Sequence, residues 1–198
     1  MPVAKEPYRL EGRTALVVGP DDDLGREIAA VLTTGGAATT RLRPELPLPA
    51  SSAAVIEAAD ILIVQTIVEA SFSAGVDDSE AIDQLHRSLV TLPTALMAKA
   101  TPAMRRRRWG RLIFIAGGDA GTAAIVVRSA QSALVRAEAR QLAADGITVN
   151  LVLANTTATA PLTEIAASVA AATQYFAGEE SSFVTGQTLQ VGGGLGGK

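Results

Sequence analysis

Residues Thr14–Gly25, TALVVGPDDDLG, carry the pattern on which the prediction of the fold depends. Their apolar half, Thr14–Val18, predicts a buried strand, and a helical pattern follows over Leu24–Leu32. A strand, a glycine turn and a helix form the unit that holds the phosphates of a dinucleotide in many α/β proteins. Here, however, the turn carries three consecutive aspartates where a negatively charged pyrophosphate would lie. The stretch therefore predicts a nucleotide-binding type of fold and leaves open whether the turn still binds a cofactor.

The composition is that of a folded, slightly acidic protein. The 198 residues fit one domain, 1–198, in which 48% of residues are hydrophobic and 19% are charged. The net charge of −3 and the lack of nucleic-acid-binding motifs argue against a nucleic-acid partner. The sequence has no cysteine, which excludes disulfides and thiolate sites. No apolar run reaches the roughly 18 residues of a membrane span, and the N-terminus lacks the apolar core of a signal peptide, so we expect a cytoplasmic protein.

Strand and helix patterns alternate along the chain. Further strands are predicted at Ala37–Leu42, Asp60–Val64, Arg111–Ile115, Ile147–Leu153 and Gln187–Val191. Further helices are predicted at Ala53–Ala59, Ser79–Arg107 (bent near Pro93 and Pro102), Ser129–Ala144 and Ile165–Phe176. This alternation predicts an α/β fold with a parallel sheet covered on both faces, followed by a flexible glycine tail from about Gly192.

Five blocks follow one another along the chain: GRTALVVGPDDDLGREIAAVL, ADILIV, RRRRWGRLIFIAG, ARQLAADGITVNLVLAN and SSFVTGQTLQVGGGL. Together they cover nearly the whole chain and resemble the short-chain dehydrogenase/reductase family. The resemblance implies a Rossmann-type fold of three layers, NAD or NADP as cofactor, and interconversion of alcohols and carbonyls. A fold does not by itself establish a function, so the site residues have to be compared one by one.

The phosphate turn departs from the family pattern. Gly19 and Gly25 match the first and third glycines of the family, but Asp23 stands at the second, where phosphate oxygens need bare backbone. Aspartates at a helix start are favoured by the helix dipole and can cap its free N–H groups. We therefore interpret Gly19, Asp23 and Gly25 as a vestigial turn that caps itself, and we expect no cofactor on this chain.

The catalytic positions of the family are also changed. Val64–Ile67 fall at the family's Asn-Asn-Ala-Gly motif, and Ile67 is expected to fill the room that the cofactor needs. Ala116-Gly117 fall at the serine pair, Val127 at the tyrosine and Gln131 at the lysine. These three residue types supply the proton transfer in the family, so we expect no catalytic residue in this chain.

No other residue offers replacement chemistry. The asparagine of the family falls near Leu89, and His86 stands alone on a helix without the convergent partners that a metal or catalytic site needs. The remaining candidates lie outside the matched blocks or lack a visible base: Tyr8, Tyr175, Ser129 and Ser132. We expect no metal site.

Two segments of the family fold are expected to be missing. The proline-rich linker Arg43–Pro49 and one short helix are too short to carry another strand with its crossover, so the outer strand of the first half should be absent. After Asn155, Thr156–Pro161 leads almost directly into the next helix, so most of the substrate lid should be absent as well.

The parts through which the family assembles are kept. They are the long helix before Arg111, the helix Ser129–Ala144 and the C-terminal block Ser182–Gly194, while Arg105–Arg108 is interpreted as a solvated helix end. These features favour a non-catalytic subunit in a mixed dimer or tetramer with a full-length, active member of the family that holds NAD or NADP. A homo-oligomer through the same surfaces is also open. Two alternatives remain: an NAD(P)-dependent oxidoreductase with unusual catalytic residues, and a small-ligand sensor that uses the emptied cleft.

Overall fold

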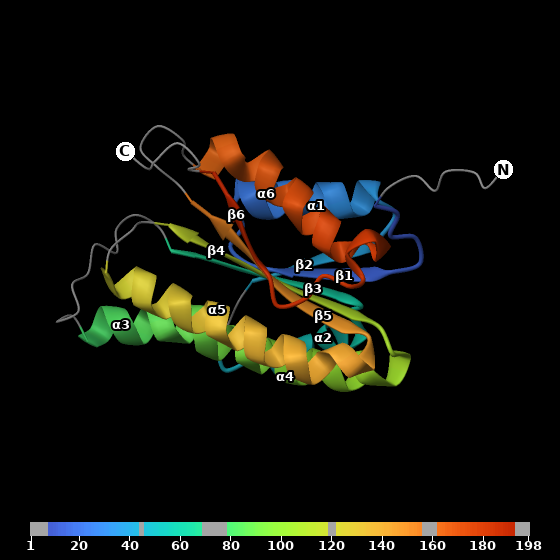
Figure 1. Cartoon of the computed structure of the whole chain (residues 1–198), viewed down its shortest axis with the longest axis horizontal. Coiled ribbons are helices and arrows are strands. Elements are labelled where there is room, and N and C mark those ends of the chain that lie inside the picture. Colours follow the sequence, from blue (N-terminus) through green and yellow to red (C-terminus); the bar gives the residue numbers. More distant parts are fainter. Residues whose placement is uncertain (1–7, 44–45, 69–78, 119–121, 156–161, 193–198) are drawn as a thin grey trace.

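A computed structural model describes residues 8–43, 46–68, 79–118, 122–155 and 162–192. A six-stranded sheet forms its centre, with helices on both faces (Figure 1). The strands are β1 (Thr14–Val18), β2 (Ala38–Leu42), β3 (Ile61–Val68), β4 (Gly110–Gly118), β5 (Ile147–Ala154) and β6 (Thr188–Val191). Their order in the sheet is β2-β1-β3-β4-β5-β6, and each neighbouring pair is parallel. This confirms the predicted fold class.

Two helical layers cover the sheet. Helices α1 (Asp23–Thr34) and α6 (Leu162–Ala177) pack against each other on one face. The other face is covered by α2 (Ala53–Ala58), α3 (Ser79–His86), α4 (Leu92–Arg107) and α5 (Thr122–Leu142), as Figure 1 shows. Because successive side chains of a strand point to opposite faces, β3 contributes side chains to the cores on both faces of the sheet. Ile61 and Ile63 join the core under α1, while Leu62 and Val64 join the core under α4 and α5.

Two helix predictions need correction. The long helix predicted over Ser79–Arg107 is interrupted by a π-helical turn at Arg87–Thr91, and α4 follows directly, with Pro93 as its second residue. Pro102 lies inside α4 without ending it. Helix α5 begins at Thr122 rather than at Ser129, although its first turns carry the β-branched residues Ile125 and Val126, whose helix propensity is weak.

The edges of the sheet agree with the expected shortening. In the part of the chain that the structure describes, β2 is an edge strand and no strand lies beyond it. A 3-10 turn (Ala50–Ser52) and α2 lead from the proline linker to β3. The lid region, residues 156–161, and most of the glycine tail, 193–198, lie outside the described residues, so those two predictions stay predictions.

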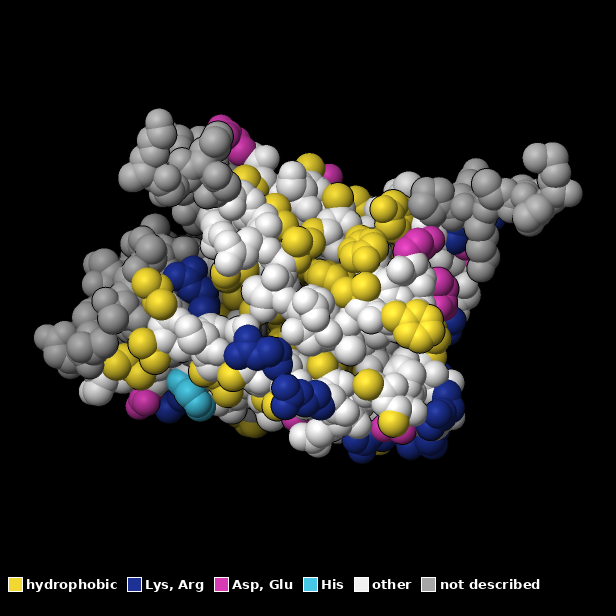
Figure 2. All heavy atoms as spheres, in the orientation of Figure 1, with side chains coloured by type: hydrophobic (Ala, Val, Ile, Leu, Met, Phe, Trp, Pro, Cys, Tyr) yellow, Lys and Arg dark blue, Asp and Glu magenta, His cyan; other side chains and the backbone are white. Residues whose placement is uncertain are grey.

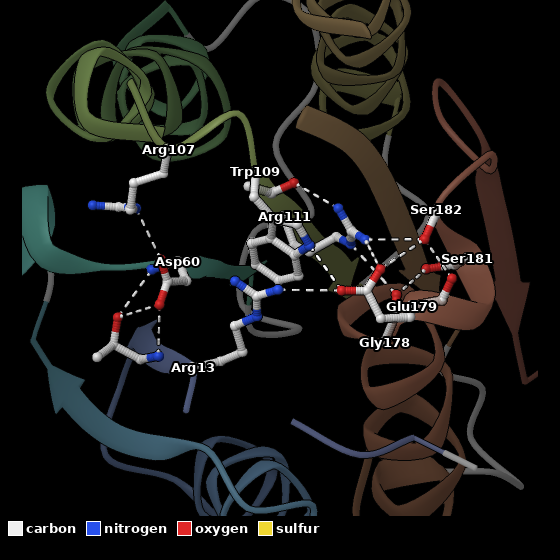
Figure 3. A network of polar contacts seen from close by, with 11 residues as sticks. Arg13, Asp60, Arg107, Trp109, Arg111, Gly178, Glu179, Ser181 and Ser182 are labelled. Atoms are coloured by element: carbon white, nitrogen blue, oxygen red, sulfur yellow. Dashed lines mark hydrogen bonds and ion pairs between the residues drawn. The ribbon is translucent and has the colours of Figure 1, made fainter. Parts of the chain in front are cut away.

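A polar network ties the amino-terminal ends of the strands together (Figure 3). The side chain of Arg111 in β4 is 2% exposed, and its guanidinium lies 4.2 Å from the ring centroid of Trp109. Arg13 lies 3.7 Å from the same centroid. The carboxylate of Glu179 joins all three, because Oε1 accepts hydrogen bonds from Trp109 Nε1 (2.9 Å) and Arg13 Nη2 (3.2 Å) while Oε2 lies 3.5 Å from Arg111 Nη2.

The neighbouring Asp60 forms a second tie at the same ends of the strands. Its Oδ2 accepts hydrogen bonds from the backbone N–H (3.0 Å) and the hydroxyl (3.1 Å) of Thr14 at the start of β1. Its Oδ1 lies 2.9 Å from Nε of Arg107 at the end of α4 (Figure 3). Asp60 therefore fixes β1, β3 and α4 relative to one another without any ligand.

The pKa of Glu179 lies below its ordinary value. Burial acts to raise this pKa, but the hydrogen bonds from Trp109 and Ser182 and the charges of Arg111 and Arg13 outweigh it. Because the pKa is lower in the folded state than in the unfolded state, the carboxylate contributes stability that is fully present above its unfolded pKa. That contribution is lost as the pH falls through its folded pKa.

The substitution Glu179→Gln should lower the free energy of unfolding at neutral pH by about 1 kcal/mol, because buried Arg111 then lacks a carboxylate that is itself half exposed and partly screened by solvent. The variant should also lose less stability than the wild type from about pH 5 to about pH 3, because only the wild type loses the contribution of this carboxylate as the pH falls. Urea unfolding at both pH values measures this. The matched control is Glu180→Gln, whose carboxylate accepts an exposed hydrogen bond from the N–H of Tyr8. If Glu179→Gln were less stable than the wild type by the same amount at both pH values, the role assigned to the carboxylate would be contradicted.

Candidate functional site

The carboxyl ends of β1, β3 and β4 lie at the edge of the sheet opposite the Arg111 network. Ligands of parallel α/β sheets bind at this edge, next to the turn that leads into the first helix. Its described part consists of the turn Gly19–Asp22, the start of α1, and the polar pair Gln65-Thr66 of β3.

Asp22 occupies the amino-terminal end of α1. It is the N-cap residue, with extended backbone, and its Oδ1 accepts a hydrogen bond of 2.8 Å from the N–H of Gly25. Its Oδ2 accepts a hydrogen bond of 2.6 Å from Nε2 of Gln65. A carboxylate thus lies where the free N–H groups and the dipole of a helix start favour an anion. The cap predicted from the aspartates is present, but Asp22 forms it, not Asp23.

The other two aspartates of the turn pair with arginines. Oδ1 of Asp21 lies 3.0 Å from Nη1 of Arg41 and 3.1 Å from Nη1 of Arg26. Asp23 pairs with Arg26 one helical turn further on. Arg41, near the end of β2, also donates a hydrogen bond of 3.0 Å to the carbonyl of Pro20, so its guanidinium reaches across the turn. The hydrogen bond and the charge of Arg41 hold the pKa of Asp21 below its ordinary value.

The two glycines of the vestigial turn make room for the protein's own side chains. A Cβ at Gly19 would lie 2.8 Å from Cβ of Gln65. A Cβ at Gly25 would lie 2.9 Å from Nη2 of Arg41 and 3.1 Å from Oε1 of Gln65. A Cβ at Gly19 would force β3 or the turn to shift, because Cβ of Gln65 cannot move by itself, whereas a Cβ at Gly25 meets only the ends of flexible side chains. The space beneath the turn is filled by Gln65.

Gln65 is the residue that the sequence comparison missed. Ile67 was expected to fill the cofactor space, but the side chain of Ile67 lies outside the described residues. Gln65 is 2% exposed and interrupts the otherwise apolar start of β3 on the face that carries Ile61 and Ile63. A buried glutamine in such a strand requires polar partners. That requirement could have indicated from the sequence that Gln65 contacts a polar group of the turn.

The residues at the expected catalytic positions are buried. Gln131 of α5 is 0% exposed, and its Nε2 donates a hydrogen bond of 3.3 Å to the hydroxyl of Thr66, which donates in turn to the carbonyl of Ile115 (3.1 Å). Ala116 and Leu89 are also completely buried. The side chain of Val127 lies outside the described residues.

Gly117 stands where the resemblance places a serine. A Cβ there would lie 2.6 Å from the carbonyl oxygen of Ala154 in the paired strand β5. Because the obstacle is backbone, β5 would have to move before any side chain could be accommodated. The position therefore cannot present a hydroxyl in this arrangement of strands.

The other candidate residues contact side chains or backbone of the protein itself. Ser129 donates to the carbonyl of Ile125 (2.8 Å), and Ser132 shares a hydrogen bond with Thr188 (3.1 Å). His86 Nδ1 lies 3.4 Å from the hydroxyl of Thr91. Tyr8 and Tyr175 pack edge to face, with ring centroids 6.5 Å apart. Among the described residues, no group of three His, Asp or Glu side chains could hold a metal ion, and no helix is long and apolar enough to cross a membrane.

Large hydrophobic side chains are exposed on α5, on the segment that leads into β6 and in β6 itself. They are Ile125 (49%), Val126 (59%), Phe183 (101%) and Leu189 (39%). Figure 2 shows hydrophobic side chains across this face, with Lys and Arg side chains among them over α5. Isolated exposed apolar residues are ordinary, but a completely exposed phenylalanine beside an edge strand is typical of an interaction surface.

Comparison with known proteins gives relatives along the whole chain. The sequence is similar to the 3-oxoacyl-[acyl-carrier-protein] reductase FabG of Salmonella typhimurium, with 28% identity over 241 residues that cover 93% of this chain and 98% of the relative. The alignment spans 241 residues and this chain has 198, so part of the relative has no counterpart in this chain. No family model matches the chain.

Solved structures share the fold. The gluconate 5-dehydrogenase from Burkholderia cenocepacia J2315, in complex with NADP and tartrate, matches with a TM-score of 0.80 and 20% identity over 96% of this chain and 98% of that one. A 3-oxoacyl (acyl-carrier-protein) reductase from Agrobacterium tumefaciens C58 with NADP bound matches with a TM-score of 0.74 and 21% identity over 92% and 94%. These relatives confirm the Rossmann-type fold, and both structures hold a nicotinamide cofactor.

The cap assigned to Asp22 gives a testable difference between neighbouring aspartates. Asp22→Ala should lower the free energy of unfolding by about 1 kcal/mol or more, because the helix loses its cap and Gln65 its acceptor. Asp23→Ala removes an exposed ion pair and should change it by less than about 0.5 kcal/mol. Urea unfolding of both variants measures this. Equal effects would show that the cap does not stabilise α1.

Proposed function

The chain belongs to the short-chain dehydrogenase/reductase family, and from that premise we propose that it is a subunit without catalytic activity of its own. It assembles with a full-length, active NAD(P)-dependent reductase or dehydrogenase in the cytoplasm, and it stabilises or regulates that partner. The observation that carries the proposal is the filled phosphate turn, in which Asp22 and Gln65 take the place of a ligand.

The first support concerns the cofactor. The structural relatives named above hold NADP. In this chain, a phosphate at the start of α1 would have to displace the carboxylate of Asp22 from the N–H of Gly25. It would also bring its charge close to Asp22, whose hydrogen-bond partners in the described residues are amides and not arginines, and this repulsion raises the free energy of binding. We therefore assign no cofactor to this chain and place NAD or NADP in the partner subunit.

The second support concerns the chemistry. Proton transfer to or from a substrate requires an acid or base within hydrogen-bond reach of the reacting group. Gln131 is buried and bonded to Thr66, and Gly117 has no room for a hydroxyl-bearing side chain. Neither residue can take the role that its position has in the family.

The third support concerns the surfaces. Helices α4 and α5 are complete, and the loop before β6 exposes Phe183 entirely. Aromatic residues are enriched at protein interfaces and often contribute most to the binding free energy. The chain thus keeps the elements for assembly in a mixed dimer or tetramer, or in a homo-oligomer.

An oxidoreductase with unusual catalytic residues is the second candidate. It is favoured by the sequence relative, whose name is that of a reductase, and by the NADP in the structural relatives. The two candidates differ in what the purified chain does alone, because only the second requires cofactor binding and turnover by this chain.

The decisive experiment compares the chain alone with the chain co-produced with full-length family members of the same organism. Alone, it should bind neither NADPH nor NADH at millimolar concentration in calorimetry and should turn over no carbonyl substrate. Co-produced with its partner, it should form a complex of defined mass in native mass spectrometry, with turnover by the complex. Binding and turnover by the chain alone would favour the second candidate.

The complex should depend on the exposed aromatic residue. Phe183→Glu should weaken assembly by about tenfold or more, because it places a charge in a buried interface. Leu46→Glu, at a side chain of the linker that is 43% exposed, is the matched control and should leave the mass of the complex unchanged. Complexes of equal stability for the two variants would remove Phe183 from the interface.

Restoring the family residues should not restore activity. The triple variant Val127→Tyr, Gln131→Lys, Gly117→Ser should remain inactive with NADPH, because the phosphate turn stays filled. Gly117→Ser alone should lower the free energy of unfolding by about 1–3 kcal/mol, because β5 must move to admit its side chain. Turnover assays and urea unfolding measure the two effects. Activity of the triple variant would contradict the proposal that this chain binds no cofactor.

A further inference from the structure

The amino-terminal end of α1 already holds an anionic group of the protein itself. Helix α1 spans Asp23–Thr34, and the carboxylate of Asp22 accepts the N–H of Gly25 at 2.8 Å. The free N–H groups and the dipole of a helix start bind phosphate and carboxylate alike. The place that would receive a phosphate is thus taken by an internal carboxylate.

Gln65 holds this carboxylate from below. Its Nε2 donates to Oδ2 of Asp22 at 2.6 Å, and the side chain is 2% exposed. Its Oε1 is buried without a hydrogen-bond partner in the described part of the chain. That oxygen would lie 3.0 Å from a Cβ at Gly19 and 3.1 Å from a Cβ at Gly25, so the carboxamide is wedged between the two glycines of the turn. A buried polar atom without a partner destabilises the fold, and here that atom lies against the two glycines of the turn, where its partial negative charge disfavours an anion.

The charges around the turn are balanced apart from Asp22. Asp21 and Asp23 pair with Arg41 and Arg26. Asp22 has no arginine among its hydrogen-bond partners in the described residues and uses only amide donors, Gly25 N–H and Gln65 Nε2. Without Asp22, the turn would carry two acids and two bases and would no longer repel an anion by its net charge.

We infer that Asp22 and Gln65 act together as an internal ligand, which occupies a latent oxyanion site at the start of α1 and closes it to external phosphate. The inference rests on the proposed function only in that this chain carries no cofactor. It adds which residues exclude the cofactor and that the anion site beneath them is retained. It also explains why the fold needs no bound nucleotide, since the N–H of the helix start is already satisfied.

Inorganic pyrophosphate is the probe, because it tests the anion site apart from the adenine and nicotinamide pockets. Binding is measured by calorimetry and by the shift of the Gly25 amide signal in nitrogen-15 NMR spectra. The wild type should show no saturable binding at about 10 mM, whereas Asp22→Gly/Gln65→Ala should bind at least about tenfold more tightly. Asp23→Gly/Gln65→Ala is the matched control, keeps the carboxylate of Asp22 and should not bind.

A second variant guards against loss of folding. Asp22→Ser/Gln65→Ala keeps a capping side chain without the charge, so α1 should form and pyrophosphate should bind. Circular dichroism confirms the fold of each variant. Binding of pyrophosphate by the wild type at the Gly25 amide would overturn the inference, as would two folded variants that bind no better than the control. The second outcome would leave the proposed function intact, since that proposal is tested by the mass of the complex and by turnover.

Discussion

The carboxylate of Asp22 is the contact on which the carboxyl edge of the sheet depends. One oxygen accepts the N–H of Gly25 at the start of α1, and the other accepts Nε2 of Gln65 in β3. This single side chain therefore joins the first helix to the strand beside β1. The contact also depends on Gly19 and Gly25, because a Cβ at either position would come close to Gln65 or Arg41. Glycines that favour a phosphate in related folds here serve a contact within the protein.

Local patterns in the sequence sufficed for most of the fold. Thr14–Val18 is a strand as predicted, and α1 and α6 begin and end within a few residues of their predicted bounds, because apolar periodicity reports burial directly. The π-helical turn at Arg87–Thr91 was not predicted, since no residue type marks it. The early start of α5 was missed because the β-branched residues Ile125 and Val126 have weak helix propensity.

The candidate site was predicted less completely, and the reason is physical. The aspartates suggested a helix cap, which is a local interaction within a few residues. The partner of that cap, Gln65, lies 43 residues further along the chain, and only the tertiary fold brings the two together. A polar residue in a buried strand predicts that a partner exists, but it does not name the partner. Gln131 is a similar case, because its bond to Thr66 spans 65 residues and joins α5 to β3.

The contacts at the two edges of the sheet are made by side chains of the protein itself. At the amino-terminal edge, Arg111 is buried against Trp109 and lies 3.5 Å from Glu179, and Asp60 joins β1 to α4. At the carboxyl edge, Asp22 and Gln65 supply the contacts that a bound phosphate would make. Neither set requires a ligand, so the sheet and the helices α4 and α5 are positioned by the chain alone. If the proposed role is correct, contacts of this kind would keep the outer surfaces of α4 and α5 in place whether or not a cofactor is present, which is what a non-catalytic partner subunit requires.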